Sequence, residues 1–222
     1  MNRWNKYGQR QVSIEVKLLT ITMSLKDLPG TGGVVLNFGQ QTDSKFNAFA
    51  SDTWRQHCVP AFIQVLNPEE TTSFVQRLQG DRRSNLLSAP KITNFDGLAV
   101  TLQCGSERPF VTGLRSRDDG SYEPQISTVE SGYRLHLRSQ LSEDQKATQL
   151  HFQFQQSEIL DVEVLTVQTK GKPASVQIPH VSRSVVASTN SLPLGHTLLI
   201  APLRRDSKGN LQVCLIRPEL VH

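Results

Sequence analysis

Two stretches of this chain alternate between apolar and polar residues with a period of two, and this pattern restricts the fold more than any other feature. In residues 133–141 the apolar side chains fall on odd positions, and in residues 149–155 they fall on even positions. Such alternation is typical of strands with one face on a core and one face in water. We therefore expect Leu135, Leu137, Phe152 and Phe154 to be buried, and Arg134, His136, Arg138, His151 and Gln153 to be exposed.

Shorter stretches extend the β pattern along the chain. Residues 11–23 alternate at first, and from Leu18 they are apolar enough for both faces to be covered. Turn residues such as Gly, Asn and Asp separate the patterned segments. Further strands are expected at residues 34–36, at 58–66 and from Leu86 onward.

Two local signals divide the region that follows Leu86. The pair Asp96-Gly97 is typical of a tight turn, so we expect the strands on either side of it to form a hairpin. Pro109 has a fixed φ and no N–H, so we expect the second strand to end near Arg108. Residues 106–130 would then form a turn-rich loop.

One helix is indicated, at residues 67–80. Asn67 can cap its first turn, and Pro68 suits the first helical position. Glu70 stands three residues after Asn67, as in a capping box, and Gly80 marks the end. The predicted class is therefore mainly β, with antiparallel sheets and one early helix. An open sheet of this kind leaves edges that must be covered or paired with another chain, which favours a β oligomer.

Composition and motifs argue against an enzyme and against a nucleic-acid partner. The chain has 222 residues and a net charge of +4, and its basic residues are scattered rather than gathered in a stripe. No sequence pattern for a phosphate loop, a nucleophile elbow or a zinc protease is present. His136 and His151 lie on strands that could be neighbours, so a shared site is conceivable. No catalytic residue, metal ligand or cofactor is predicted.

The cysteines and the N-terminal residues give information about the cellular compartment of the protein. Cys58, Cys104 and Cys214 have no metal-ligand spacing, and we expect free thiols. A Cys58–Cys104 or a Cys104–Cys214 bridge stays open if the compartment is oxidising. Residues 1–10 read as a polar tail without the apolar core of a signal peptide, and no apolar run reaches the length of a membrane helix.

Five segments in order resemble the C-terminal domain of the secretins, the ring-forming channels of type II and type III secretion, type IV pili and filamentous phage export. The stretch "LLSAPKITNFDGLAVTLQCGSERPFVTG" resembles the hallmark of that family, a Ser-x-Pro strand, a second strand that reaches a glycine, and a loop that closes on another glycine. The other segments are "VSIEVKLLTITM", "ISTVESGYRLHLRSQLSEDQKATQLHFQFQQSE", "IPHVSRSVVASTNSLPLGHTLLIAPL" and "CLIRPELV".

The resemblance implies a secretin-like β-domain over residues 11–222 that forms a homo-oligomeric barrel in the outer membrane or the periplasm. It implies partners in the same ring, other secretion components and an exported protein substrate. It also implies a gate-like loop at Pro109, Phe110, Val111, Thr112 and Gly113, with Gly113 in a backbone conformation that β-branched residues resist. Arg134, His136 and Arg138 would then face the lumen.

One segment departs from the family pattern. Secretins carry a Val-Pro-x-Leu-Gly type segment before their last strand, whereas this chain has "RRDSKGNLQ" at residues 204–212. That segment belongs to the membrane-side end of the barrel. The second hypothesis is therefore a soluble β interaction module derived from the same fold, in which the sheet edges bind another protein.

Overall fold

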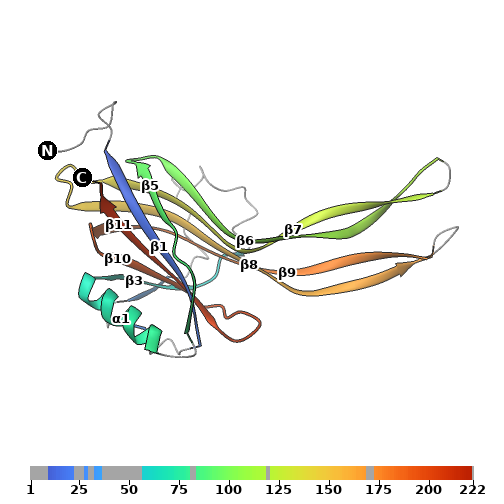
Figure 1. The fold of residues 1–222 in the computed structure, drawn as a ribbon, viewed down its shortest axis with the longest axis horizontal. Helices are drawn as coiled ribbons and strands as arrows, with labels where there is room; N and C mark the ends of the chain where they lie inside the picture. Colours follow the sequence, from blue (N-terminus) through green and yellow to red (C-terminus); the bar gives the residue numbers. More distant parts are fainter. Residues whose placement is uncertain are drawn as a thin grey trace. The chain divides into compact units, whose positions relative to one another are not determined.

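The described part of the chain folds into antiparallel β-sheets, as the alternation predicts, with one α-helix (Figure 1). The computed structural model describes residues 10–22, 28–29, 33–36, 57–80, 84–118, 121–168 and 173–221. The elements are β1 (Gln11–Ile21), β2 (Val34–Leu36), β3 (Ala61–Leu66), α1 (Pro68–Gly80), β4 (Ser84–Ser88), β5 (Lys91–Phe95), β6 (Ala99–Ser116), β7 (Tyr122–Leu141), β8 (Ala147–Val167), β9 (Ala174–Pro193), β10 (Thr197–Pro202) and β11 (Leu211–Leu220).

Two compact units make up the chain. Unit 1 comprises residues 1–102, 135–154 and 184–222, and unit 2 comprises residues 103–134 and 155–183. The long strands β6, β7, β8 and β9 each contribute residues to both units. These four strands form one sheet in the order β6-β7-β8-β9.

Unit 1 contains a seven-stranded sheet with β1 near its centre. The order is β2-β3-β10-β11-β1-β4, and β5 also pairs with β1. β1 pairs with β11 from Val12↔Leu220 to Ile21↔Leu211. A strand with neighbours on both sides and both faces covered should be apolar throughout, and β1 is buried at Leu18 and Leu19 in succession. The sequence predicted that both faces of the strand are covered from Leu18 onward, and this prediction is confirmed.

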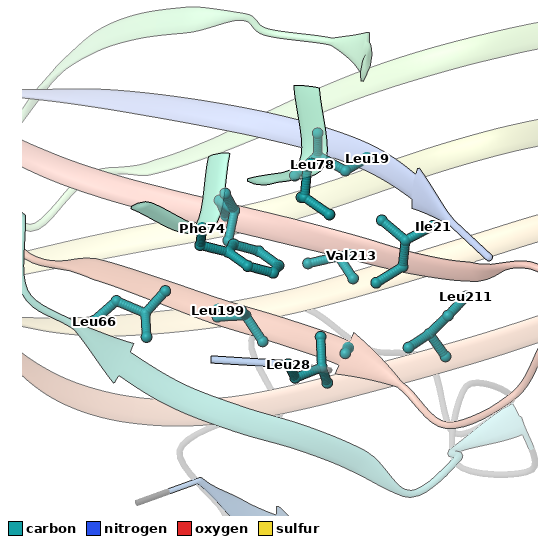
Figure 2. Close-up of a cluster of buried hydrophobic side chains, with 11 residues drawn as sticks. Leu19, Ile21, Leu28, Leu66, Phe74, Leu78, Leu199, Leu211 and Val213 are labelled. Atoms are coloured by element: carbon teal, nitrogen blue, oxygen red, sulfur yellow. The ribbon is translucent and has the colours of Figure 1, made fainter. Parts of the chain in front are cut away.

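Helix α1 covers one face of this sheet. Its first turn closes as a capping box: the Asn67 N–H donates to Glu70 Oε2, and the Glu70 N–H donates to Asn67 Oδ1, each over 2.8 Å. Phe74 and Leu78 point into a cluster with sheet residues (Figure 2). The cluster comprises Leu19, Ile21, Leu28, Leu66, Phe74, Leu78, Leu199, Ala201, Leu211, Val213 and Leu215. Among the described helices, none is long and apolar enough to span a membrane.

The register expected for β7 and β8 is confirmed for the apolar positions. Leu137 is fully buried, and Phe152 is 1% exposed. Gln153 was expected in water, but it is only 5% exposed, so that expectation is wrong. Gln153 lies in β8, which has a paired strand on both sides, and inner strands are more often covered on both faces than edge strands are. Alternation determines on which face of the strand a residue lies, and neighbouring side chains then determine how much of that face is exposed to solvent.

The turn at Asp96-Gly97 is not the turn of a hairpin. β5 pairs with β1 in the seven-stranded sheet, whereas β6 pairs with β7 in the other sheet, so the chain changes sheets here. The corner is bound to β7 by three hydrogen bonds. The Leu141 N–H donates to Asp96 Oδ1, the Gly97 N–H donates to the Ser139 carbonyl, and Arg138 Nε donates to the Gly97 carbonyl, over 2.7–2.8 Å.

None of the three cysteines, which all lie among the described residues, forms a disulfide, so neither bridge considered from the sequence is present. Cys104 is exposed on β6, and Cys58 is half-buried. Cys214 is fully buried in β11, and this burial raises the pKa of its thiol. A thiol that stays protonated is a poor nucleophile, so Cys214 acts as a small apolar core residue.

The buried and the half-buried side chains of β7 should differ in their effect on stability. Leu137→Ala should lower the free energy of unfolding by about 2–5 kcal/mol, because it leaves a cavity in the core. Alternation alone predicts under about 0.5 kcal/mol for Arg138→Ala. The bond from Arg138 to the Gly97 carbonyl raises that expectation to about 1–2 kcal/mol. Chemical denaturation of both variants measures this, and a larger loss for Arg138→Ala than for Leu137→Ala would show that the register is wrong.

Candidate functional site

The residues expected to form a gate loop lie in a β-hairpin. β6 continues to Ser116 and β7 begins at Tyr122, and the Arg117 N–H donates to the Ser121 carbonyl over 2.9 Å. Most of residues 106–130 are therefore strand, and the expectation that the strand ends near Arg108 is wrong. The hairpin is part of unit 2.

Pro109 lies inside β6, and the strand continues past it to Ser116. β6 is an edge strand whose one partner in its sheet is β7. Prolines occur within sheets chiefly on edge strands, so this position is compatible with a continuous β6. Two residues further on, the Val111 N–H donates to Gln177 Oε1 of β9 over 3.1 Å, so a side chain accepts this backbone donor.

Gly113 has an extended conformation in β6. Its φ lies outside the left-handed region, so the expectation of a backbone angle that other residues resist is wrong. A Cβ at this position would lie 2.8 Å from Gln125 Oε1, which is the end of a flexible side chain that can move aside. A side chain at position 113 is therefore tolerated at low cost.

Gly105 and Gly132 are the glycines that the backbone requires, and sequence reasoning missed them. A Cβ on Gly105 would lie 2.0 Å from the Ser131 carbonyl oxygen. A Cβ on Gly132 would lie 2.4 Å from the Cys104 carbonyl oxygen, and the φ of Gly132 is +121°. Neighbouring backbone cannot move aside as a side chain can. The close approach of β6 and β7 in unit 2 therefore depends on both glycines.

The three residues expected to face a lumen share one face of β7, and each makes a hydrogen bond. Arg134 Nη2 forms an ion pair with Glu130 and donates to Gln103 Oε1. His136 Nδ1 lies 2.7 Å from Thr101 Oγ1. Arg138 donates to the Gly97 carbonyl, as described above. These polar side chains thus connect β7 to β6 and to the turn before it.

The two histidines considered for a shared site have different partners. His151 Nδ1 lies 2.8 Å from Thr189 Oγ1 of β9, and its Nε2 lies 3.2 Å from Gln140 Oε1 of β7. His136 instead bonds to β6. Within the described residues, no group of three or more His, Cys, Asp or Glu side chains could hold a metal ion.

The hairpin connection between β10 and β11 is a compact turn built on Asp206. Its Oδ1 accepts hydrogen bonds from the N–H groups of Lys208 and Asn210, at 3.0 and 2.7 Å. Its Oδ2 accepts from the side chains of Asn210 and Gln212, at 3.2 and 3.1 Å. This closed turn stands where the secretin pattern has the Val-Pro-x-Leu-Gly type segment.

Unit 2 has almost no core. Phe110 is its one buried residue among those the structure describes, at 3% exposure, and the Arg108 guanidinium lies 5.4 Å from the centre of its ring. Two hairpins form this unit, β6/β7 and β8/β9, and the Val111–Gln177 bond joins them (Figure 1). Its exposed apolar residues include Tyr122, Ile126, Leu160, Val164, Leu165, Val167 and Ile178.

The two outer strands of the four-stranded sheet have one edge each that no other strand of that sheet pairs, and on β9 part of this edge is covered, because Val185 forms a parallel bridge with Cys58 and its carbonyl accepts from the Val59 N–H over 3.1 Å. β6 is 18 residues long and β9 is 20 residues long, and each pairs with one strand of that sheet. An edge strand presents unpaired N–H and C=O groups that can accept a further strand. These two edges, together with the hairpins of unit 2, are the candidate functional site.

Comparison with known proteins gives similar structures but no sequence family. No family model matches the chain, and no curated protein matches it. The InvG secretin domain β-barrel of the Salmonella SPI-1 injectisome is 11% identical with a TM-score of 0.42, over 96% of this chain and 64% of that chain. Aeromonas hydrophila ExeD is 12% identical with a TM-score of 0.40, over 96% and 49%. GspD from enteropathogenic Escherichia coli is 15% identical with a TM-score of 0.41, over 96% and 70%.

The InvG and GspD structures are secretins, the family that the sequence motifs resemble. The chain spans 64% and 49% of the first two matched chains. Because all three TM-scores are below 0.5, we argue the function from this chain's own strands and side chains.

The glycines of unit 2 should differ sharply in their tolerance of a side chain. Gly132→Ala should lower the free energy of unfolding by about 2–3 kcal/mol, because it combines a positive φ with a contact against backbone. Gly113→Ala is the matched control on the same hairpin, and it should cost under about 1 kcal/mol. Chemical denaturation followed by circular dichroism measures both, and equal losses would contradict the close approach at Gly132.

Proposed function

We propose that this chain is a subunit of a homo-oligomeric, secretin-like β-barrel channel for protein export across the outer membrane. The observation that carries the proposal is unit 2, in which Phe110 is the one buried residue among those described. Apolar burial is the main favourable term in folding, and a unit this exposed buries little of its own surface. Neighbouring copies of the chain would supply the missing contacts.

The strand order supports side-by-side assembly. In an antiparallel sheet ordered β6-β7-β8-β9, the two outer strands run in opposite directions. β6 of one copy can therefore add to β9 of the next copy in antiparallel fashion, with all hairpin ends at the same side. A ring of copies closed in this way has no free edge, which removes the risk of uncontrolled strand addition.

Within such a barrel, the polar face of β7 would line the lumen through Arg134, His136 and Arg138. Water would solvate these side chains and the residues to which they bond. Exposed aliphatic residues of β8 such as Leu160 and Val164 would contact neighbouring subunits or the barrel surroundings. The alternation read from the sequence would thus divide a wet face from a covered face.

The β6/β7 hairpin would fold into the lumen as a gate that includes Pro109, Phe110, Val111, Thr112 and Gly113. Its two strands approach closely at Gly105 and Gly132, where the positive φ of Gly132 departs from regular strand geometry. A break of this kind gives a hairpin a direction different from that of a regular strand.

The partners of the ring would be further copies of this chain, other components of a secretion system and an exported protein. Location in the outer membrane or the periplasm follows from the same proposal. These assignments follow from the resemblance to secretins. They are tested in the same way as the channel proposal, by measuring whether the protein assembles into a ring.

The alternative is a soluble β interaction module that uses the same edges to bind a different protein. The closed turn at Asp206 favours it, since that turn replaces the segment that secretins place at the membrane-side end of the barrel. Subunit number separates the two functions, because a channel needs a large ring and a module needs a monomer or a small oligomer.

Assembly through the outer strands can be tested with two exposed isoleucines of unit 2. Ile178 lies on the edge strand β9 and is 38% exposed, whereas Ile126 lies on the inner strand β7 and is 64% exposed. A lysine on an edge strand opposes strand addition. Mass photometry over a concentration series should show large oligomers for the wild type, and Ile178→Lys should lower the assembled fraction about tenfold.

Ile126→Lys is the control, and it should change the assembled fraction less than about twofold. A wild-type protein that is monomeric at every concentration would count against the channel and favour the interaction module. Equal effects of the two lysines would show that the edges are not the contact.

The protein should not insert into a bilayer by itself. A barrel wall that faces lipid needs an apolar band about 25 Å tall with aromatic girdles. Only 6% of the residues are aromatic, and a polar turn replaces the membrane-side segment. In liposome flotation we expect weak association that carbonate removes, and stable carbonate-resistant association would contradict this.

A further inference from the structure

We propose that Phe110 and Gln177 form a latch that sets the position of the β6/β7 hairpin relative to the β8/β9 hairpin within unit 2. The latch consists of the buried Phe110 ring and the hydrogen bond from the Val111 N–H to Gln177 Oε1. It belongs to a single chain, so it does not depend on assembly. That the hairpin it positions serves as a gate rests on the proposed function.

The burial of Phe110 requires cover from outside its own hairpin. Residues 103–109 of β6 and residues 122–128 of β7 are all exposed, whereas Phe110 is 3% exposed. The Arg108 guanidinium lies 5.4 Å from the centre of the Phe110 ring, within the range of a cation–π contact. A two-stranded hairpin has no second layer of its own that could enclose the rest of the ring. The other hairpin of unit 2 therefore supplies this cover.

The neighbouring backbone group shows where the two hairpins meet. The Val111 N–H donates to Gln177 Oε1 over 3.1 Å, and both residues are half-buried. Gln177 lies in β9, so this bond connects the first hairpin to the second. The acceptor is a side chain, so a substitution at position 177 can remove the bond without removing a backbone group.

The latch is separate from the close approach of β6 and β7 at Gly105 and Gly132. Between Gly105 and Phe110, every residue of β6 is exposed. The φ of Gly132 is +121°, a conformation that is open to glycine and strained for other residues. The hairpin thus has a glycine-dependent point near its base and a small buried contact further along. Among the described residues of unit 2 no other side chain is buried, so loss of the Phe110 ring should weaken this contact most.

The consequence for a channel is a gate held by its own subunit. Release of the latch breaks one bond to β9 and exposes one ring, while the two strands of each hairpin stay paired. A released hairpin can therefore take another position without separating the strands that would join neighbouring subunits.

Hydrogen exchange at the Val111 N–H measures how often the latch opens. Phe110→Ala should speed this exchange by about tenfold or more, because the contact loses its buried ring. Gln177→Met removes the acceptor at similar side-chain length, and it should speed the exchange by about threefold. Gln177→Glu keeps an acceptor oxygen, and it should stay within about twofold of the wild type.

A distance measurement separates release of the hairpin from the loss of one bond. Spin labels at Ser116→Cys in β6 and Thr166→Cys in β8 report on one hairpin each, because both positions are exposed. Cys58 and Cys104 are replaced by serine, and the fully buried Cys214 stays unlabelled. Diluting the labelled chain with an excess of unlabelled chain restricts the signal to distances within one copy.

The wild type should give a single narrow distance distribution, and Phe110→Ala should broaden it toward longer distances. Ile126→Ala is the matched control, since Ile126 lies on the same hairpin at 64% exposure and its loss should change nothing. If circular dichroism shows that Phe110→Ala does not fold, Gln177→Met carries the test, because it leaves the ring in place.

The two proposals fail in different ways. A folded Phe110→Ala chain with wild-type distances, or a Gln177→Met chain in which Val111 exchanges as in the wild type, would overturn the latch even if a ring forms. A wild-type protein that stays monomeric would overturn the channel, whereas a distance change on loss of Phe110 would still support the latch in that monomer.

Discussion

Every backbone N–H and C=O group needs a hydrogen-bond partner, and each outer strand of the four-stranded sheet, β6 and β9, has one edge that no other strand of that sheet pairs. This constraint accounts for several otherwise separate features. Gln177 supplies a side-chain acceptor to Val111 in place of a missing strand. Phe110 provides the small core that joins the two hairpins of unit 2. These features reduce the number of hydrogen-bonding groups that a single copy exposes at its sheet edges, but they leave part of each edge uncovered.

Unit 1 differs from unit 2, because its own strands and its helix supply most of the partners that its strands require. β1 has neighbours on both sides, and α1 closes one face with Phe74 and Leu78. The corner at Asp96-Gly97 joins the two sheets of this unit, and three hydrogen bonds hold it on β7. The buried apolar side chains of the described residues therefore lie almost entirely in unit 1, and Phe110 is the one that lies in unit 2.

The sequence predicted those features that local chemistry determines. Alternation placed Leu137 and Phe152 in the core, and the Asn67–Glu70 spacing located the start of the helix. It did not show which strands pair, because Asp96-Gly97 marks a turn whether the chain returns beside itself or moves to another sheet. It also assigned the special glycine to position 113, since one glycine in a sequence looks like another. Gly132 is distinguished by its positive φ and by the nearby carbonyl of a strand distant in sequence, and neither can be seen in the sequence.

The misjudged residue Pro109 shows why the end of a strand is hard to predict from sequence alone. Proline is tolerated inside an edge strand, and β6 lies at the edge of its sheet. Which strands lie at an edge depends on pairing between segments that are distant along the chain. Pro109 therefore predicts the end of β6 only if β6 is taken as an inner strand, and the local sequence does not show whether it is.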